Sequence, residues 1–207
     1  MMSRFLLLAA FWTLSSTHNV IAVKCPPLSQ VQKPEVVANY NISKHTGRFF
    51  EILFMDTVET FCTCFWKNRI LTNSSLHDDD RLFCGAMGKG LWFNVTEENY
   101  LIPGQKAAFD LVMESPIIRK IHFPNKVLGY GEDAQGKYGG KYAWTIEYQC
   151  IEELGSQVYM GLNLYHREWN PPAEDIQAMK QVVRNAGLQD HWVKLKHMGS
   201  DKCNYPA

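Results

Sequence analysis

The sequence predicts an all-β fold: an eight-stranded antiparallel up-and-down β-barrel with one C-terminal α-helix packed on the outside. Short apolar or alternating runs recur from Arg48 to Tyr165, separated by turn residues, and no helical pattern falls between them. Consecutive strands with short connections pair antiparallel, as in a meander. A closed barrel is favoured over a sandwich because closure removes the unpaired strand edges.

The runs place strands at about 48–55, 61–70, 81–87, 91–102, 106–113, 125–130, 141–150 and 157–166. Period two is clearest in KYAWTIEYQC, where Tyr142, Trp144, Ile146 and Tyr148 share an aromatic face. A packed core explains such a face, and so does the wall of a ligand cavity. An eight-stranded barrel is just wide enough to fill itself with side chains or to hold one small ligand.

The stretch REWNPPAEDIQAMKQVVRNAGLQD, residues 167–190, predicts a helix from about 172 to 186. Asn170 is a candidate cap, two prolines occupy the entry, and Gly187 ends the helix. One apolar stripe runs along it, formed by Ile176, Met179, Val182, Val183 and Ala186. A helix with a single stripe must pack on something, and the outside of the barrel is the available surface.

The first 22 residues predict a secretory signal peptide, with Arg4 before an apolar run and Ala22 at the cleavage site. That run is about ten residues long, shorter than the roughly 20 that a spanning helix needs. We therefore expect residues 23–207 to form a single secreted, extracellular barrel domain with a disulfide-pinned C-terminal tail.

Cysteines and sequons agree with export. An even number of cysteines in an exported chain predicts three disulfides, and the six lie at Cys25, Cys62, Cys64, Cys84, Cys150 and Cys203. A CxC spacing suits two disulfide partners better than a metal or redox site. Sequons at Asn41, Asn73 and Asn94 predict N-glycosylation.

Charge and motifs argue against several other functions. The 21 basic and 21 acidic residues balance, without a basic run, so nucleic acid is not an expected partner. The cluster His77 to Asp80 is interpreted as a solvated loop rather than a metal site. No GxSxG, HExxH or glycine-rich phosphate loop is present, and three disulfides leave no nucleophilic thiol, so neither enzyme activity nor a cofactor is predicted.

Several motifs resemble those of the lipocalins, specifically the apolipoprotein D and insect bilin-binding group, over essentially the whole mature chain. They are Cys25-Pro26-Pro27, YNISKHTGRFFEI at 40–52, Tyr-Gln-Cys at 148–150, Arg167 before the Pro-Pro and helix, and the terminal Cys203. Gly47 matches the family's Gly-x-Trp motif, but Phe49 replaces the tryptophan. The Thr-Asp-Tyr motif is not intact, because an insertion separates Leu128 from Tyr142.

The resemblance implies structural pairings. Arg167 corresponds to the arginine that packs over the first motif and closes the base of the barrel, here on Phe49. Cys25 would pair with Cys150. Cys203 would pair with Cys62 or Cys64, and the spare cysteine with Cys84.

The resemblance also implies a secreted carrier that binds a small hydrophobic ligand, such as a fatty acid, retinoid, steroid or bilin-type pigment, for transport or sequestration. The candidate cavity residues are Trp144, Tyr142, Asn163, Tyr165 and Lys126. Lys126 would favour a carboxylate ligand if it faced the cavity, and would have no such role on the outer face. The alternative is a secreted interaction or signalling protein that acts through its surface. A lipoprotein or cell-surface partner is left open.

Overall fold

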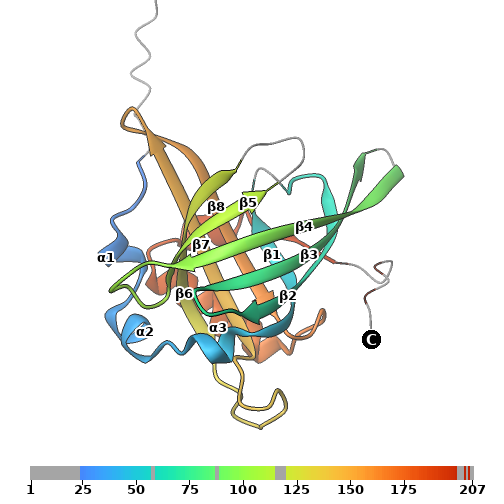
Figure 1. The fold of residues 1–207 in the computed structure, drawn as a ribbon, viewed down its shortest axis with the longest axis horizontal. Coiled ribbons are helices and arrows are strands. Elements are labelled where there is room, and N and C mark those ends of the chain that lie inside the picture. Colours follow the sequence, from blue (N-terminus) through green and yellow to red (C-terminus); the bar gives the residue numbers. More distant parts are fainter. Residues whose placement is uncertain are drawn as a thin grey trace, which may run out of the picture.

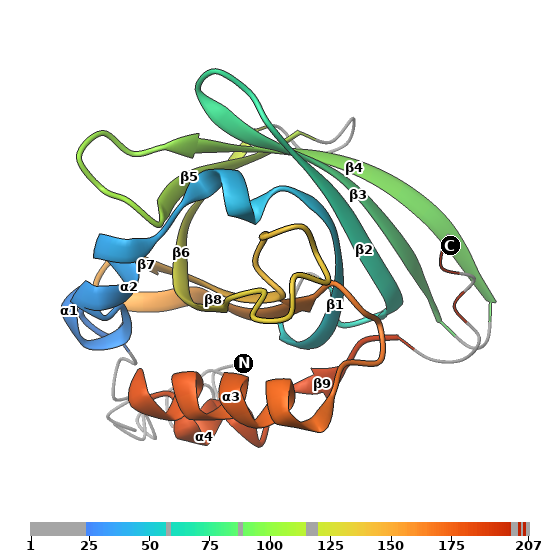
Figure 2. The same cartoon turned by 90° about the horizontal axis from the view of Figure 1, so that it is seen from below.

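The computed structural model describes residues 24–56, 59–86, 89–114, 120–199, 203 and 205. The predicted signal peptide lies outside these residues. Eight antiparallel strands curve into a closed barrel, and helix α3 lies along its outside (Figures 1 and 2). The predicted fold class is therefore confirmed.

The strands follow the chain in meander order. They are β1 (Gly47–Met55), β2 (Cys62–Leu71), β3 (Ser75–Ala86), β4 (Lys89–Leu101), β5 (Ala108–Glu114), β6 (Ile121–Gly131), β7 (Trp144–Glu153) and β8 (Ser156–His166). β1 pairs with both β2 and β8, which closes the barrel. The two-residue strand β9 (Lys196–His197) pairs antiparallel with β1 at Leu53 and Phe54.

The interpretation of His77 to Asp80 as a loop is wrong. β3 begins at Ser75, and these four residues pair with both β2 and β4. Asp78 and Asp80 are buried in the barrel, whereas His77 and Asp79 lie on the opposite face. The prediction failed because charged residues fill both faces here, so no apolar alternation marks the strand.

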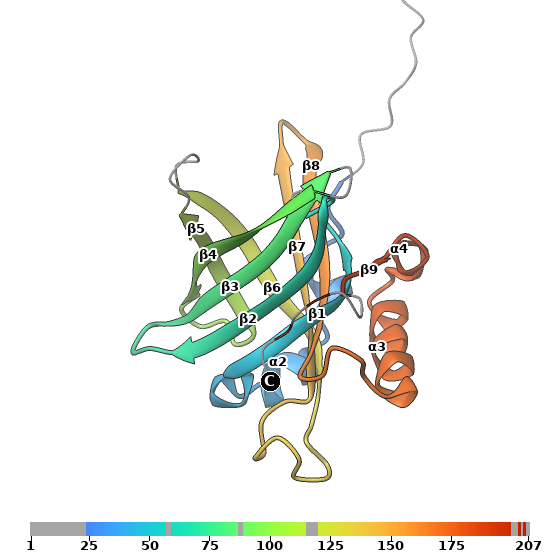
Figure 3. The same cartoon turned by 90° about the vertical axis from the view of Figure 1, so that its right-hand side faces the viewer.

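Short helices from the N-terminal segment close one end of the barrel, which we call the base (Figure 3). They are α1 (Leu28–Val31), α2 (Pro34–Asn39) and the 3-10 helix η1 (Ile42–His45). The side chain of Gln32 donates to the carbonyls of Ala107 and Val127, at 2.8 and 3.0 Å, and so fastens this segment to β5 and β6. The turn between β7 and β8 lies at the opposite, open end.

Arg167 lies across the base. Its guanidinium carbon is 4.1 Å from the centre of the Phe49 ring. The same group donates to the backbone carbonyls of Tyr142, Arg48 and Thr46, at 2.6, 3.0 and 2.8 Å. These bonds join β1 to the loop before β7, so the arginine is held by backbone geometry as well as by its cation–π contact.

The structure contains three disulfides, Cys25–Cys150, Cys62–Cys84 and Cys64–Cys203, and no free cysteine. Of the two partners left open for Cys203, the tail takes Cys64. A β-bulge between Cys62 and Cys64 separates their roles, since Cys62 is the direct strand partner of Cys84. No helix of the described residues has the length and apolar character needed to cross a membrane.

Helix α3 (Ala173–Asn185) packs on the outer face of the barrel, as its stripe predicts. Its N-cap is Pro172, without a side-chain cap, so the expected role for Asn170 is wrong: the extended Pro171-Pro172 pair delays the first helical residue to Ala173. Gly187 follows the helix with φ +75°, which only glycine adopts without strain. A short helix, α4 (Gln189–Trp192), follows.

Met179 is fully buried between α3 and the outer face of β6, β7 and β8. We expect Met179→Ala to lower the free energy of unfolding by about 2–4 kcal/mol, because it removes buried apolar contacts and leaves a cavity. Gln177→Ala, on the exposed side of the same helix, should change it by less than about 0.5 kcal/mol. Urea denaturation of the two variants tests this. Equal effects would contradict the described packing.

Candidate ligand-binding site

Polar and charged side chains fill the half of the barrel nearest the base. Their positions follow from period two, since Lys67 and Arg69 face inward from β2 and Asp78 and Asp80 face inward from β3. The strand register sets Lys67 opposite Asp80 and Arg69 opposite Asp78. Opposite charges therefore meet directly across the two strands.

Arg69 is the centre of this buried network. Its guanidinium donates two hydrogen bonds to Asp78, at 2.7 and 2.6 Å, and one to Glu147, at 2.6 Å. Asn125 donates to the other oxygen of Glu147, at 2.8 Å. Burial raises the pKa of Asp78 and Glu147, but the charges of Arg69 and Lys67 and the hydrogen bonds to these carboxylates together outweigh burial and leave both pKa values below normal. Both side chains are therefore carboxylates at neutral pH.

His45 lies beside Arg69 at the base. Its ring nitrogens contact the hydroxyl groups of Tyr40 and Thr145, at 2.6 and 3.1 Å. Burial and the Arg69 charge lower the pKa of His45 to about 4. The ring is thus neutral at physiological pH and links the short N-terminal helices to β7.

Lys67 lies one layer closer to the open end. Its ammonium nitrogen is 3.3 Å from Asp78, 3.8 Å from Asp80 and 3.5 Å from Glu97. Oxygens of these three carboxylates lie within 4.8 Å of one another, a spacing that could suit a metal ion. The ammonium group already occupies the space between them, so the geometry fits an internal ion cluster rather than a metal site.

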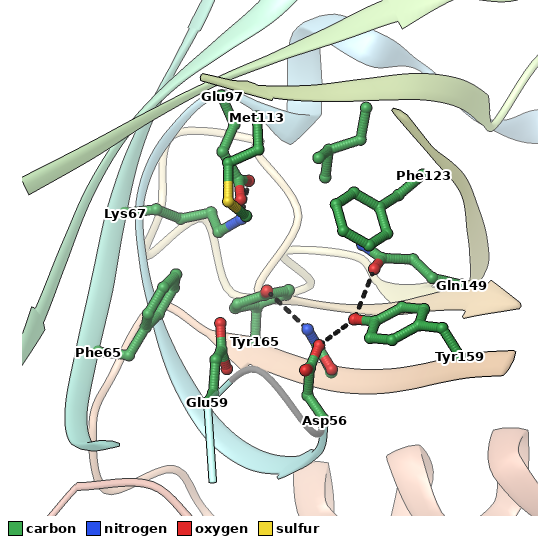
Figure 4. A pocket seen from close by; sticks show the side chains of 12 residues that line it. Asp56, Glu59, Phe65, Lys67, Glu97, Met113, Phe123, Gln149, Tyr159 and Tyr165 are labelled. Carbon is green, nitrogen blue, oxygen red and sulfur yellow. Dashed lines mark hydrogen bonds and ion pairs between the residues drawn. The ribbon is translucent and has the colours of Figure 1, made fainter. Parts of the chain in front are cut away.

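Above Lys67, toward the open end, a cavity of about 30 Å³ remains (Figure 4). That is on the order of the space for two water molecules. The lining combines aromatic, aliphatic, amide and carboxylate groups: Asp56, Glu59, Phe65, Lys67, Glu97, Leu111, Met113, Phe123, Gln149, Tyr159, Asn163 and Tyr165. The site is consequently small and mixed in polarity, not a long apolar tunnel.

Two carboxyl groups beside the cavity have strongly altered acidity. Burial and the nearby Glu59 charge raise the pKa of Glu51 well above normal. Burial and the charges of Asp56 and Glu97 raise the pKa of Glu59 to about 7, although Glu51 and Lys67 act in the opposite direction. The Glu51–Glu59 pair therefore retains at least one proton at neutral pH.

The raised pKa of Glu59 predicts a contribution to stability that is present below about pH 4.5 and is lost as the pH rises to about 7. A folded-state pKa above the unfolded value means that stability is lost as pH rises through the folded pKa, here about 7 for Glu59. The depressed pKa of His45, about 4, acts in the opposite direction below about pH 6.5, because this histidine is protonated there in the unfolded chain and neutral in the folded protein. We expect a loss of roughly 1–3 kcal/mol.

Urea denaturation at several pH values measures this effect. Glu59→Gln should remove the loss of stability that Glu59 causes between about pH 4.5 and pH 7, while Glu153→Gln, an exposed change of the same charge at the end of β7, should leave it unchanged. If the free energy of unfolding depends on pH equally in wild type and in Glu59→Gln, Glu59 is not the titrating group.

The structure places two of the five predicted cavity residues, Asn163 and Tyr165, on the cavity wall. Tyr142 is buried at the base, stacked against Tyr40 and Tyr130. Its hydroxyl accepts a hydrogen bond from the backbone N–H of Asn41, at 2.7 Å. It is part of the barrel floor, away from the cavity.

Trp144 and Lys126 lie outside the barrel, contrary to the expected register. Trp144 belongs to the core cluster beneath α3. Lys126 is a half-buried residue in a crevice formed with the N-terminal segment around Leu28. β7 starts only at Trp144, so the alternation does not extend back to Tyr142, and the inward residues are Thr145, Glu147 and Gln149.

The sequence reasoning missed the buried charges. A usable signal was present: Lys67 and Arg69 are two residues apart, as are Asp78 and Asp80, and a short turn joins the two segments. When two basic residues alternate on one strand and two acidic residues alternate on the next, the opposite charges are expected to face each other across the strand pair.

Comparison with family models and with curated protein sequences finds no match. Comparison with solved structures finds lobster apocrustacyanin A1, with 12% identity over 86% of this chain and 91% of that chain and a TM-score of 0.65. Apocrustacyanin C2 has 12% identity over 89% and 93%, with a TM-score of 0.67. Insecticyanin from the tobacco hornworm Manduca sexta has 11% identity over 87% and 88%, with a TM-score of 0.64. The chain therefore has the lipocalin fold.

Proposed function

We propose that this protein is a secreted carrier that takes one small ligand into the open end of its barrel, for transport or sequestration. The observation that carries the proposal is the cavity above Lys67, closed from below by the Arg69 network and lined by side chains from six strands. The fold and the three disulfides support it. Membership of the apolipoprotein D and insect bilin-binding group stays a prediction.

The volume and depth of the cavity restrict the ligand. A bilin, retinoid, steroid or long-chain fatty acid needs most of the barrel interior, where Arg69, Asp78 and Glu147 are fully buried and bonded to one another. Displacing them would separate buried charges at a cost of several kcal/mol. A molecule of only a few heavy atoms fits the cavity of about 30 Å³ at the open end without that cost.

Native mass spectrometry of the protein secreted by a eukaryotic host, deglycosylated, before and after organic extraction, tests the proposal. We expect a stoichiometric small adduct that extraction removes. Asn163→Phe should fill the cavity and abolish the adduct. Val158→Phe, an exposed position on the same strand, should retain it. Equal adduct on both variants would place the ligand outside the barrel.

A surface function is the second candidate, because apolar side chains gather where β3 and β4 extend past the barrel. Leu91, Trp92 and Phe93 are 69%, 43% and 48% exposed, and Phe61 is 68% exposed. Backbone bonds bring these segments together, since Phe61 accepts from Gly85 at 2.9 Å and Gly85 pairs with Gly90. If no adduct forms and no small molecule binds, this surface becomes the better explanation.

A further inference from the structure

We propose that the cavity binds a small organic cation, a protonated amine with a short apolar group, whose ammonium group donates to Glu59 and to the side-chain oxygen of Asn163. This inference rests on the proposed function and specifies its ligand class. It departs from the expectation of a purely hydrophobic ligand, and three independent observations support it.

The first observation is the kind of polar atom left without a partner. Among the described residues, the unpartnered buried side-chain atoms of the barrel interior are all oxygens: both of Glu51, and one each of Glu59, Asp80, Asn125 and Asn163. Glu51 and Glu59 share the proton that the pair retains, so the acceptors open to a ligand on the cavity wall are those of Glu59 and Asn163. Asn163 is 5% exposed, and its amide nitrogen donates to Tyr165 at 3.4 Å, which leaves its oxygen free. A ligand that satisfies this wall must therefore supply donors.

The second observation is the balance of charge around the network and the cavity. Two basic side chains, Lys67 and Arg69, face seven acidic ones: Glu51, Asp56, Glu59, Asp78, Asp80, Glu97 and Glu147. Arg69 is paired with Asp78 and Glu147, and Lys67 with Asp78, Asp80 and Glu97. Neither cation has an ion pair with Glu51 or Glu59 among the described residues, and Glu59, the member of the pair that ionises near pH 7, can accept a positive charge from a ligand.

The third observation is the aromatic wall. The Lys67 ammonium nitrogen lies 4.6 Å from the centre of the Tyr165 ring and 5.4 Å from that of Phe65. Phe123 and Tyr159 form a second aromatic pair, with ring centres 5.1 Å apart. Ring faces attract ammonium groups. The cavity wall thus already accommodates one ammonium group and presents further aromatic surface for the apolar part of a ligand.

This arrangement makes binding depend on pH. The groups that face Glu59 are Glu51 and Asp56 from the β1 segment, Lys67 from β2 and Glu97 from β4, and the pKa of Glu59 is about 7. An alkylammonium keeps its proton up to about pH 9, as a lysine side chain does. Affinity should therefore rise about tenfold from pH 6 to pH 8, as Glu59 loses its proton.

Isothermal titration calorimetry with three probes that are small enough for the cavity tests the ligand class: ethylammonium, ethanol and acetate. We expect the amine to bind at least tenfold more tightly than the alcohol or the carboxylate. Glu59→Gln should weaken amine binding at least tenfold and remove its pH dependence, whereas Glu153→Gln should do neither. Asn163→Leu, which removes the second acceptor without changing charge, gives an independent readout if Glu59→Gln fails to fold.

The outcomes separate the two proposals. If the alcohol or carboxylate binds as tightly as the amine, or if both cavity variants bind the amine like wild type, the cation inference is overturned while a carrier function survives. If no probe binds and the secreted protein carries no extractable adduct, the inference and the proposed function both fail.

Discussion

Replacement of Arg69 by methionine is expected to lower the free energy of unfolding by about 3–5 kcal/mol at pH 8. Arg69 is fully buried and donates three short hydrogen bonds to Asp78 and Glu147. Methionine fills much of the same volume but leaves both carboxylates without their principal cation. The penalty is that of uncompensated buried charge, which is larger than the net contribution of the intact network.

The same reasoning gives the pH dependence of this variant. Arg69 holds the pKa values of Asp78 and Glu147 below normal, and without it burial raises them. The variant can then neutralise both groups by taking up protons, so its deficit relative to wild type should shrink at pH 5. Urea denaturation of wild type and variant at pH 5 and pH 8 measures both the loss of stability and its dependence on pH.

Arg81→Met is the matched control, since Arg81 is exposed on the neighbouring strand and lies over the Trp66 ring at 6.0 Å. It should cost less than about 1 kcal/mol at either pH. A deficit for Arg69→Met that is small, or that does not depend on pH, would mean that Asp78 and Glu147 find other partners in the folded protein.

Local patterns were sufficient to predict the elements of the fold. The apolar stripe that includes Met179 and Val183, followed by Gly187, predicts α3 to within one residue at each end. Both signals depend only on residues close together in the sequence. The alternating runs predict five of the eight strands to within two residues at each end; β6 begins four residues earlier than predicted, and β7 lies three residues later. β3 was predicted to start at 81 instead of Ser75, because its inward positions are charged and their burial depends on Lys67 and Arg69, across the strand pair.

The candidate site was less predictable for the same reason. Period two shows that Trp144 and Glu147 lie on opposite faces, but not which face is inside, and a one-residue choice reverses the whole strand. The alternation and the register of the resembled family selected Trp144, and it is indeed buried, beneath α3 rather than in the barrel. A helix outside the barrel gives the strands beneath it two buried faces, so burial alone does not identify the cavity wall.

The remaining large effect concerns the disulfide that fixes the tail. Removing Cys64–Cys203 by the double change to alanine is expected to cost on the order of 4–5 kcal/mol, against roughly 3 kcal/mol for Cys62–Cys84, in the loop-entropy model. The difference arises because the first bond spans 139 residues and the second spans 22. Both disulfides include a cysteine of β2, so the difference between the two variants reports mainly the effect of loop length.

Loss of Cys64–Cys203 should also release folded-state contacts. The tail between β9 and the disulfide is tied to the barrel by Met198, which donates to Ile52 at 3.0 Å, and by Gly199, which donates to Thr63 at 2.7 Å. Hydrogen exchange should therefore accelerate at these two amides in the Cys64/Cys203 variant and stay slow in the Cys62/Cys84 variant. Equal destabilisation by the two variants, with both amides protected, would show that contacts of the tail, rather than its covalent bond, hold it on the barrel.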